Sequence, residues 1–102
     1  MSNRTIWKYA IPINVLTASS TTVQRIPDGA RYLDCGLQKD GIALWYEIPE
    51  PAAEKVVHRF QLFGTGTGPI GDHLRYVGTV QVPAAADSDF VLVLHVYEVI
   101  EP

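Results

Sequence analysis

An alternation of apolar and polar residues at every second position is the feature of this sequence that most restricts its fold. The clearest case surrounds Asp40-Gly41, because residues 31–38 alternate before this pair and residues 42–48 alternate after it. Asp-Gly between two alternating runs is the strongest short-range signal for a β-hairpin, since both residues tolerate the positive φ angles of a tight turn. The sequence therefore predicts a hairpin over residues 31–48.

Similar runs recur every ten to fifteen residues along the chain, with Gly- or Pro-containing segments between them. They cover residues 5–11, 21–26, 56–63, 75–82 and 90–100. No window shows the stripe of an amphipathic helix. This spacing predicts an all-β fold, a small, mostly antiparallel β-sandwich or flattened barrel of about seven strands with little or no helix. With 102 residues, we expect a single domain over residues 1–102.

The alternation also predicts the two faces of the hairpin. The side chains predicted to face the core are Leu33, Cys35, Leu37, Ile42, Leu44, Tyr46 and Ile48. Trp45 then points away from the core, beside Tyr32 on the neighbouring strand. Asp34 and Glu47 are expected as cross-strand neighbours on this outer face, where a pair of exposed acids indicates a solvated surface rather than a catalytic pair.

Aromatic residues suggest an interaction surface. Trp7 and Tyr9 share one face of the first strand with Ile11, and Tyr32 and Trp45 are expected on the outer face of the hairpin. Several exposed aromatic side chains together mark a protein interface. We therefore predict a homo-oligomer that uses Trp7, Tyr9, Tyr32 and Trp45, while coverage of these faces by the Pro-rich and Gly-rich loops is the alternative.

Composition excludes several classes of protein. The chain has 8 Lys and Arg against 11 Asp and Glu, and a net charge of −3 disfavours non-specific binding to nucleic acid. No apolar run approaches the length of a membrane span, and the first residues lack the apolar stretch of a signal peptide. Cys35 is the single cysteine, so no intrachain disulfide forms; we expect a buried thiol and a reducing cytoplasm.

A Gly-rich segment, residues 64–73, is the candidate binding loop. Residues 66–71 match G-x-G-x-x-G, but Pro69 interrupts them and a strand rather than a helix follows, which argues against a dinucleotide fold. Exposed backbone amides in such a loop can instead form a nest for an anion. The alternative is a flexible surface connection whose glycines serve only for turning.

The spacing of residues in the sequence gives little support for a metal site or a catalytic site. His58, His73 and His95 lie 15 and 22 residues apart, which is no zinc-ligand spacing. The sequence has no G-x-S-x-G motif, and a hydrolase would need one histidine to meet a carboxylate in a cleft. We expect no metal, no cofactor and no enzyme activity, with His95 satisfied on the outer face of the last strand beside Tyr97.

Several segments, taken in this order, resemble a family of uncharacterised proteins of about 100 residues encoded by bacteriophages and prophages. They are Ile6-Trp7-Lys8-Tyr9, residues 26–31, Leu44-Trp45, Arg59-Phe60, residues 63–66, residues 76–79 and residues 95–98. The resemblance spans nearly the whole chain and implies an accessory phage protein in the cytoplasm of the bacterial host. It assigns no catalytic residues, and this chain has a longer, more Gly-rich segment 65–73 than the family pattern.

These observations favour a non-catalytic binding protein. The specific hypothesis is a host-defence antagonist that sequesters a nucleotide-derived immune signal, with Trp45 or Tyr76 stacking on a base. The candidate ligand-binding residues are Arg59, Thr65, Gly66, Thr67, His73, Arg75 and Tyr76. The alternative is a protein–protein adaptor or structural component of a phage or host assembly, which would bind a host or phage protein through the aromatic surface.

Overall fold

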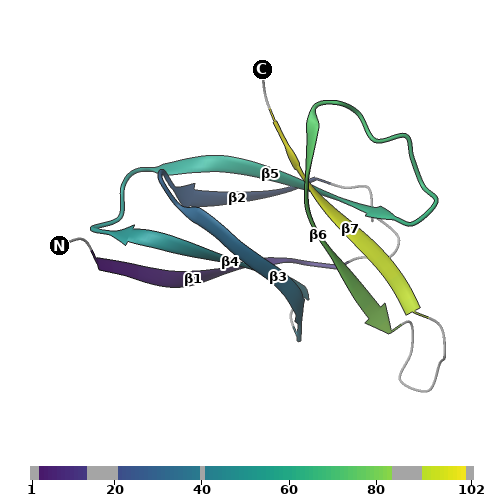
Figure 1. Cartoon of the computed structure of the whole chain (residues 1–102), viewed down its shortest axis with the longest axis horizontal. Coiled ribbons are helices and arrows are strands. Elements are labelled where there is room, and N and C mark those ends of the chain that lie inside the picture. Colours follow the sequence, from purple (N-terminus) through teal and green to yellow (C-terminus); the bar gives the residue numbers. More distant parts are fainter. Residues whose placement is uncertain (1–2, 14–20, 40, 84–90, 101–102) are drawn as a thin grey trace.

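Seven antiparallel strands in two sheets make up the fold, and this confirms the predicted small β-sandwich (Figure 1). The computed structural model describes residues 3–13, 21–39, 41–83 and 91–100. The strands are β1 (Asn3–Ile11), β2 (Thr21–Pro27), β3 (Arg31–Gln38), β4 (Gly41–Glu50), β5 (Lys55–Gly64), β6 (Leu74–Pro83) and β7 (Val91–Val99). No helix long and apolar enough to span a membrane occurs in this part of the chain.

The strands divide into a three-stranded sheet A, with the order β1-β4-β3, and a four-stranded sheet B, with the order β2-β5-β7-β6. The predicted β3–β4 hairpin is confirmed, and its closing pair is Gln38↔Gly41. Gly41 has a φ of 129°, and an added Cβ would collide with the backbone of Ile11 on β1. A glycine at this position therefore allows β1 to lie close beside the end of the hairpin.

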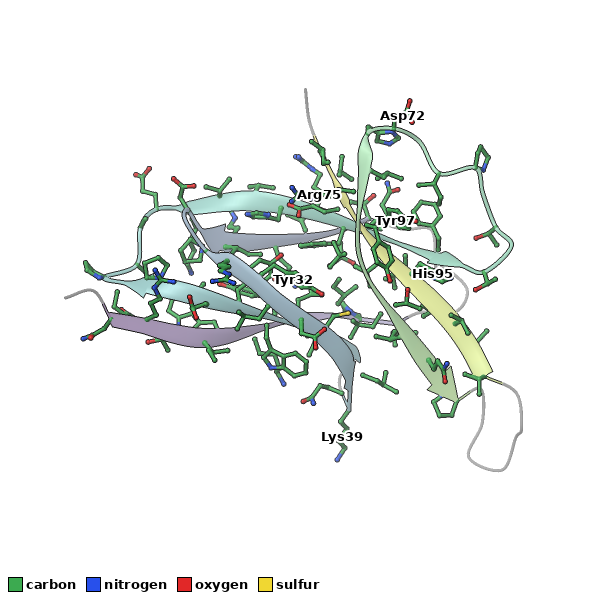
Figure 2. The ribbon with its side chains drawn as sticks, in the orientation of Figure 1. Tyr32, Lys39, Asp72, Arg75, His95 and Tyr97 are labelled. Carbon is green, nitrogen blue, oxygen red and sulfur yellow. The ribbon has the colours of Figure 1, made fainter. Side chains whose placement is uncertain are left out.

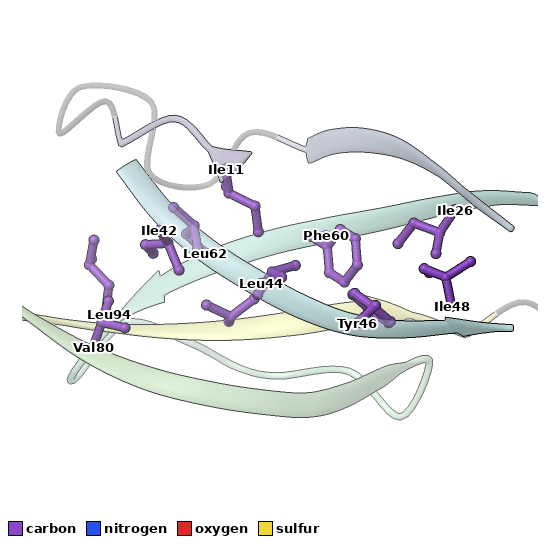
Figure 3. Close-up of a cluster of buried hydrophobic side chains, with 11 residues drawn as sticks. Ile11, Ile26, Ile42, Leu44, Tyr46, Ile48, Phe60, Leu62, Val80 and Leu94 are labelled. Carbon is purple, nitrogen blue, oxygen red and sulfur yellow. The ribbon is translucent and has the colours of Figure 1, made fainter. Parts of the chain in front are cut away.

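The core lies between the two sheets and is built from alternate residues of the strands. Its fully buried members are Ile11, Ile26, Ile42, Leu44, Ile48, Phe60 and Val96, with Tyr46, Leu62, Val80 and Leu94 almost as deeply placed. Figure 3 shows the β4 members of this set in one row. The predicted inward set on β4 is therefore confirmed.

Because of two β-bulges, some side chains lie on the opposite face of the sheet from the one predicted. A register shift between Tyr32 and Asp34 in β3 turns Leu33 outward, where it is 38% exposed, and directs Tyr32 to the core. Cys35 faces inward as predicted, whereas Leu37, opposite the buried Ile42, remains 41% exposed at the sheet edge. One extra residue reverses the alternation beyond it, which explains the wrong prediction.

The second bulge, between Tyr76 and Gly78 in β6, meets the first where the edges of the two sheets come together. Tyr32 Oη donates to the Val77 carbonyl at 3.2 Å, and Gly78 leaves space for the Cys35 thiol. Tyr76 therefore faces outward, whereas Val77 packs against the core.

The opposite pair of sheet edges is also connected. Gln24 Nε2 on β2 donates to the carbonyl of Ala10 on β1 at 2.7 Å. Strand β7 lies inside sheet B, as a central strand should, but only its inner face is covered, because Val91 is 49% exposed on the outer face. This outer face carries the candidate site.

Candidate functional site

The Gly-rich loop begins with a tight turn directly after β5. Thr67 donates to the Gly64 carbonyl twice, from its amide at 3.2 Å and from its hydroxyl at 2.7 Å. Gly66, at the third position of this turn, has a φ of 87°, as a type II turn requires. The turn holds Thr65 at the end of sheet B, where its amide donates to the Val93 carbonyl at 3.3 Å.

These bonds reduce the number of amides available to an anion. The amides of Thr65 and Thr67 are both engaged, whereas those of Gly66 and Gly68 donate to no acceptor within the described part of the chain. The predicted anion-binding nest is therefore limited to the amides of Gly66 and Gly68, which alternate with engaged amides. The glycine at position 66 also fits the turning role, since an added Cβ would meet nothing within 4 Å.

A chain of hydrogen bonds joins the loop to β6 and β7 on the outer face of sheet B. Thr65 Oγ1 lies 2.8 Å from His95 Nε2, and His95 Nδ1 lies 2.9 Å from Thr79 Oγ1. Thr79 Oγ1 in turn lies 2.5 Å from the Tyr76 hydroxyl. His95 is thus satisfied through both ring nitrogens on the outer face, as predicted, and three segments on which the family resemblance rests meet here.

A hollow of about 180 Å³ adjoins this chain. Its lining is Phe63, Gly64, Thr65, Gly66, Thr67, Ile70, His95 and Tyr97. The rings of Phe63 and Tyr97 meet edge to face with their centroids 5.5 Å apart, and the rings of Tyr76 and Tyr97 do so with their centroids 5.6 Å apart. Sites for drug-sized ligands usually exceed about 300 Å³, so this hollow has room for one ring or one small polar group.

The described strand residues on the outer face of sheet B include positive side chains and no negative ones. They include Thr21, Val23, Arg25, Val57, Arg59, Gln61, Phe63, Tyr76, Thr79, Gln81, Val91, Val93, His95, Tyr97 and Val99. Among these residues there is no Asp or Glu, although the whole chain has a net charge of −3. The local charge therefore favours an anionic ligand at this face.

The structure divides the predicted ligand-binding residues. Thr65, Gly66 and Thr67 line the hollow, and Tyr76 and Arg59 share its face of the sheet. Arg59 precedes Phe63 by four residues, or about 13 Å along a strand, so it lies beyond the rim. His73 lies at the far end of the loop, where its ring contacts Gly71 and its carbonyl accepts from the Ile100 amide.

Arg75 lies on the other side of the sheet. Its guanidinium donates to Glu98 Oε1 at 2.8 Å on the inner face, and Figure 2 shows it across β6 from Tyr97 and His95. Glu98 is only 9% exposed, and its second oxygen lies 2.6 Å from His58 Nδ1. Arg75 is therefore committed to a buried carboxylate and does not reach the loop.

Glu98 is a residue of the inner cluster that was not predicted from the sequence. A signal was present, because Glu98 follows Leu94 and Val96 at alternate positions of the buried face. His58 meets this carboxylate, which satisfies one condition for a hydrolase. No Ser, Thr or Cys is hydrogen-bonded to His58 in the residues that the structure describes, so no activated nucleophile is assembled there.

Three tyrosines surround this inner cluster. Burial, reinforced by the negative charge of Glu98, raises the pKa of Tyr46 above its ordinary value. Burial and a hydrogen bond with Cys35 raise the pKa of Tyr32, and burial raises that of Tyr9. The rings of Tyr9 and Tyr32 meet Tyr46 edge to face at 5.8 and 5.5 Å, so the three phenols form one packed, neutral group.

The predicted aromatic interface is also divided by the structure. Trp7, Tyr9 and Tyr32 pack against the core, whereas Trp45 lies on the outer face of sheet A with its ring against Gly36. Asp34 pairs with Trp45 rather than with Glu47, which binds Arg4. The four aromatic side chains therefore do not share one exposed patch, and the predicted neighbours Tyr32 and Trp45 face opposite sides.

No group of three or more potential metal ligands lies together in the described ranges. The three histidines lie apart, on the inner face, in the loop and on the outer face. A larger hollow of about 360 Å³ occurs elsewhere, and it is lined by Pro12, Ile13, Leu37, Gln38, Lys39, Gly41 and Val82. None of the predicted ligand-binding residues belongs to it, and Lys39 is the one charged residue among its described lining.

The comparisons with known proteins are consistent with an uncharacterised family. Neither the curated proteins nor the solved structures contain a match to this chain. One family matches residues 2–102, and the chain therefore belongs to this family, which is described as a domain of unknown function (DUF7352).

Proposed function

We propose that the protein is a non-catalytic binding protein that holds a small nucleotide-type anion on the outer face of sheet B. The observation that carries the proposal is the hollow beside the Gly-rich turn. Aromatic side chains line it together with Thr65, Thr67 and His95, and no carboxylate of the described residues does. Aromatic rings suit a base, while hydroxyl and amide hydrogens suit its oxygens.

The cellular role follows from the family resemblance described above. In this proposal the protein is a phage or prophage product in the cytoplasm of the bacterial host. There it antagonises host defence by sequestering a nucleotide-derived immune signal. A sequestering protein needs tight binding but no chemical step, which agrees with a site built from uncharged donors and rings. Self-association through the exposed part of sheet B would bring a second hollow into one assembly.

Isothermal titration calorimetry with a panel of linear and cyclic nucleotides tests the proposal. We expect heat with at least one nucleotide, and an affinity at least tenfold lower in Thr65→Val, which removes a hydroxyl at the hollow. Thr21→Val is the matched control, because Thr21 lies on the edge strand β2, does not line the hollow, and has a hydroxyl that accepts from Gln61. Folded protein that gives no heat with any nucleotide would refute the proposal.

A protein–protein adaptor is the second candidate. It is favoured by four apolar side chains that are about half exposed on the outer face of sheet B, namely Val23, Val57, Tyr76 and Val91. Apolar surface of this kind gathers at protein interfaces. Capture of one host or phage protein from infected cells, lost in Val57→Glu, would support this candidate, whereas light scattering would measure self-association.

A further inference from the structure

The hydrogen-bonded chain on the outer face has one more hydrogen than it uses. Tyr76, Thr79, neutral His95 and Thr65 each contribute one polar hydrogen, and three hydrogen bonds join them. One polar hydrogen therefore remains to be donated to a group outside this hydrogen-bonded chain. Its location depends on which ring nitrogen of His95 carries the proton, because each nitrogen faces a different threonine.

With the proton on Nε2, His95 donates to Thr65, Thr79 donates to Nδ1 and Tyr76 donates to Thr79. The remaining hydrogen is then that of the Thr65 hydroxyl, at the hollow. With the proton on Nδ1, Thr65 must donate to Nε2, and its oxygen can only accept from a ligand. The two tautomers thus present opposite hydrogen-bonding groups at the same atom.

Tyr76 determines which tautomer is favoured. A phenol is a stronger donor and a weaker acceptor than an aliphatic hydroxyl, because its ring delocalises the oxygen lone pair. The 2.5 Å contact between Tyr76 and Thr79 is therefore best made with Tyr76 donating. Thr79 can then donate its own hydrogen to His95 Nδ1, which places the ring proton on Nε2. Aligned bonds of this kind strengthen one another.

The residues around the hollow also favour a ligand that accepts a hydrogen bond from Thr65. Gly66 also lines the hollow, and its amide has no acceptor in the described residues. Arg25 and Arg59 share the sheet face, and the described strand residues of this face include no carboxylate. A ligand that presents an oxygen to Thr65 therefore meets hydrogen-bond donors and positive charge. A ligand that presents an amino group meets no negative charge among the described strand residues of this face, and its acceptors there are the hydroxyl oxygens of Thr65 and Thr67.

We propose that this chain of hydrogen bonds makes the hollow selective for nucleotides whose base carries an oxo group, as hypoxanthine and uracil do. Nucleotides whose base carries an amino group at the same position bind more weakly. The exocyclic carbonyl oxygen of the base accepts from the Thr65 hydroxyl, and the base lies against Tyr97 and Phe63. The phosphate remains outside, because the hollow is too small to hold both the base and the phosphate. Tyr76 does not line the hollow, so it acts as a positioning residue through Thr79 and His95. The inference rests on the proposed function and names its ligand class.

Two matched pairs of nucleotides test the selectivity. Inosine and adenosine monophosphates differ in an oxo against an amino group on one purine, and uridine and cytidine monophosphates differ likewise on one pyrimidine. We expect the oxo member of a pair to bind about tenfold more tightly, as one well-made hydrogen bond to a base commonly provides. Tyr76→Phe should reduce this ratio to about twofold, whereas the control Tyr9→Phe, on the inner face, should preserve it.

Nitrogen-15 NMR of the full chain labelled at histidine gives a second measurement that needs no ligand. We expect the Nε2-protonated form of His95 in the wild-type protein and a larger Nδ1-protonated fraction in Tyr76→Phe. Equal affinity for both members of each pair, or an Nδ1-protonated ring in the wild type, would overturn this inference alone. Absence of binding by all four nucleotides and by the panel above would overturn the proposed function with it.

Discussion

Strand β7 separates two polar clusters that are both built around a histidine but differ in charge and burial. On its inner face, Glu98 is 9% exposed and binds His58 and Arg75. On its outer face, His95 joins the hydroxyls of Thr65 and Thr79, and the hydrogen-bonded chain that they form with Tyr76 has one more polar hydrogen than it uses. A buried charge must be compensated within the fold, whereas an exposed donor is available to a ligand. The inner cluster therefore supports the structure, and the outer cluster is the one suited to recognition.

Substitutions that add side-chain volume should give the largest difference in unfolding free energy between the inner and outer sides. In Gly78→Val, the new side chain would collide with the Cys35 thiol where β3 meets β6, and we expect the free energy of unfolding to fall by about 3 kcal/mol. On the outer side, Gly66→Ala meets open space and loses only about 1 kcal/mol through its positive φ. Urea unfolding followed by tryptophan fluorescence measures both. Equal losses would contradict the distinction.

Removal of polar groups should give the next largest contrast. Glu98→Gln deletes the carboxylate that both His58 and Arg75 bind, so we expect unfolding to become easier by about 2 kcal/mol. His95→Gln changes a partly exposed, uncharged cluster on the outer face and should alter stability by less than about 0.5 kcal/mol. The same variant should weaken nucleotide binding at least fivefold. A larger loss of stability in His95→Gln than in Glu98→Gln would reverse the roles assigned to the clusters.

The strands could be predicted from the sequence because alternation and turn residues are local signals. The pairing of residues 41 and 38, for example, follows from the Asp-Gly turn alone. The facing of Tyr32 and Val77 could not be predicted, since each lies at a bulge and one inserted residue reverses the alternation. Nothing in the local sequence around residues 32 or 77 marks the inserted residue.

The candidate site was only partly predictable for a different reason. The Gly-rich turn is visible in the sequence, but the partners of its side chains depend on which strands are neighbours. Thr79 and His95 come together because β6 pairs with β7, and Arg75 is drawn to Glu98 by the same pairing. The sequence indicated a cationic group near the loop, whereas cross-strand register assigns Arg75 to the opposite face.

Alkaline pH should affect the inner side of the sandwich. Burial raises the pKa values of Tyr32 and Tyr46, whereas an unfolded chain titrates tyrosine near pH 10. Their contribution to stability is complete below pH 10. Above it, the unfolded chain loses protons that the folded protein retains, so the free energy of unfolding falls by about 1.4 kcal/mol per pH unit and tyrosine. Tyr46→Phe should remove one tyrosine's share of this slope in urea titrations between pH 8 and 11, and an unchanged slope would contradict the prediction.

The smallest expected effect concerns Tyr9 and shows that burial of a polar group stabilises only when a partner is present. Its hydroxyl is buried and has no hydrogen-bond partner in the described part of the chain. Tyr9→Phe removes this unsatisfied group and preserves the ring contact with Tyr46, so we expect a gain of about 0.5 kcal/mol in unfolding free energy. Because Tyr9 lies on the inner face of sheet A, nucleotide affinity should not change. A loss of stability in Tyr9→Phe would mean that the hydroxyl has a bonding partner, and the inner aromatic group would then be part of a wider polar network.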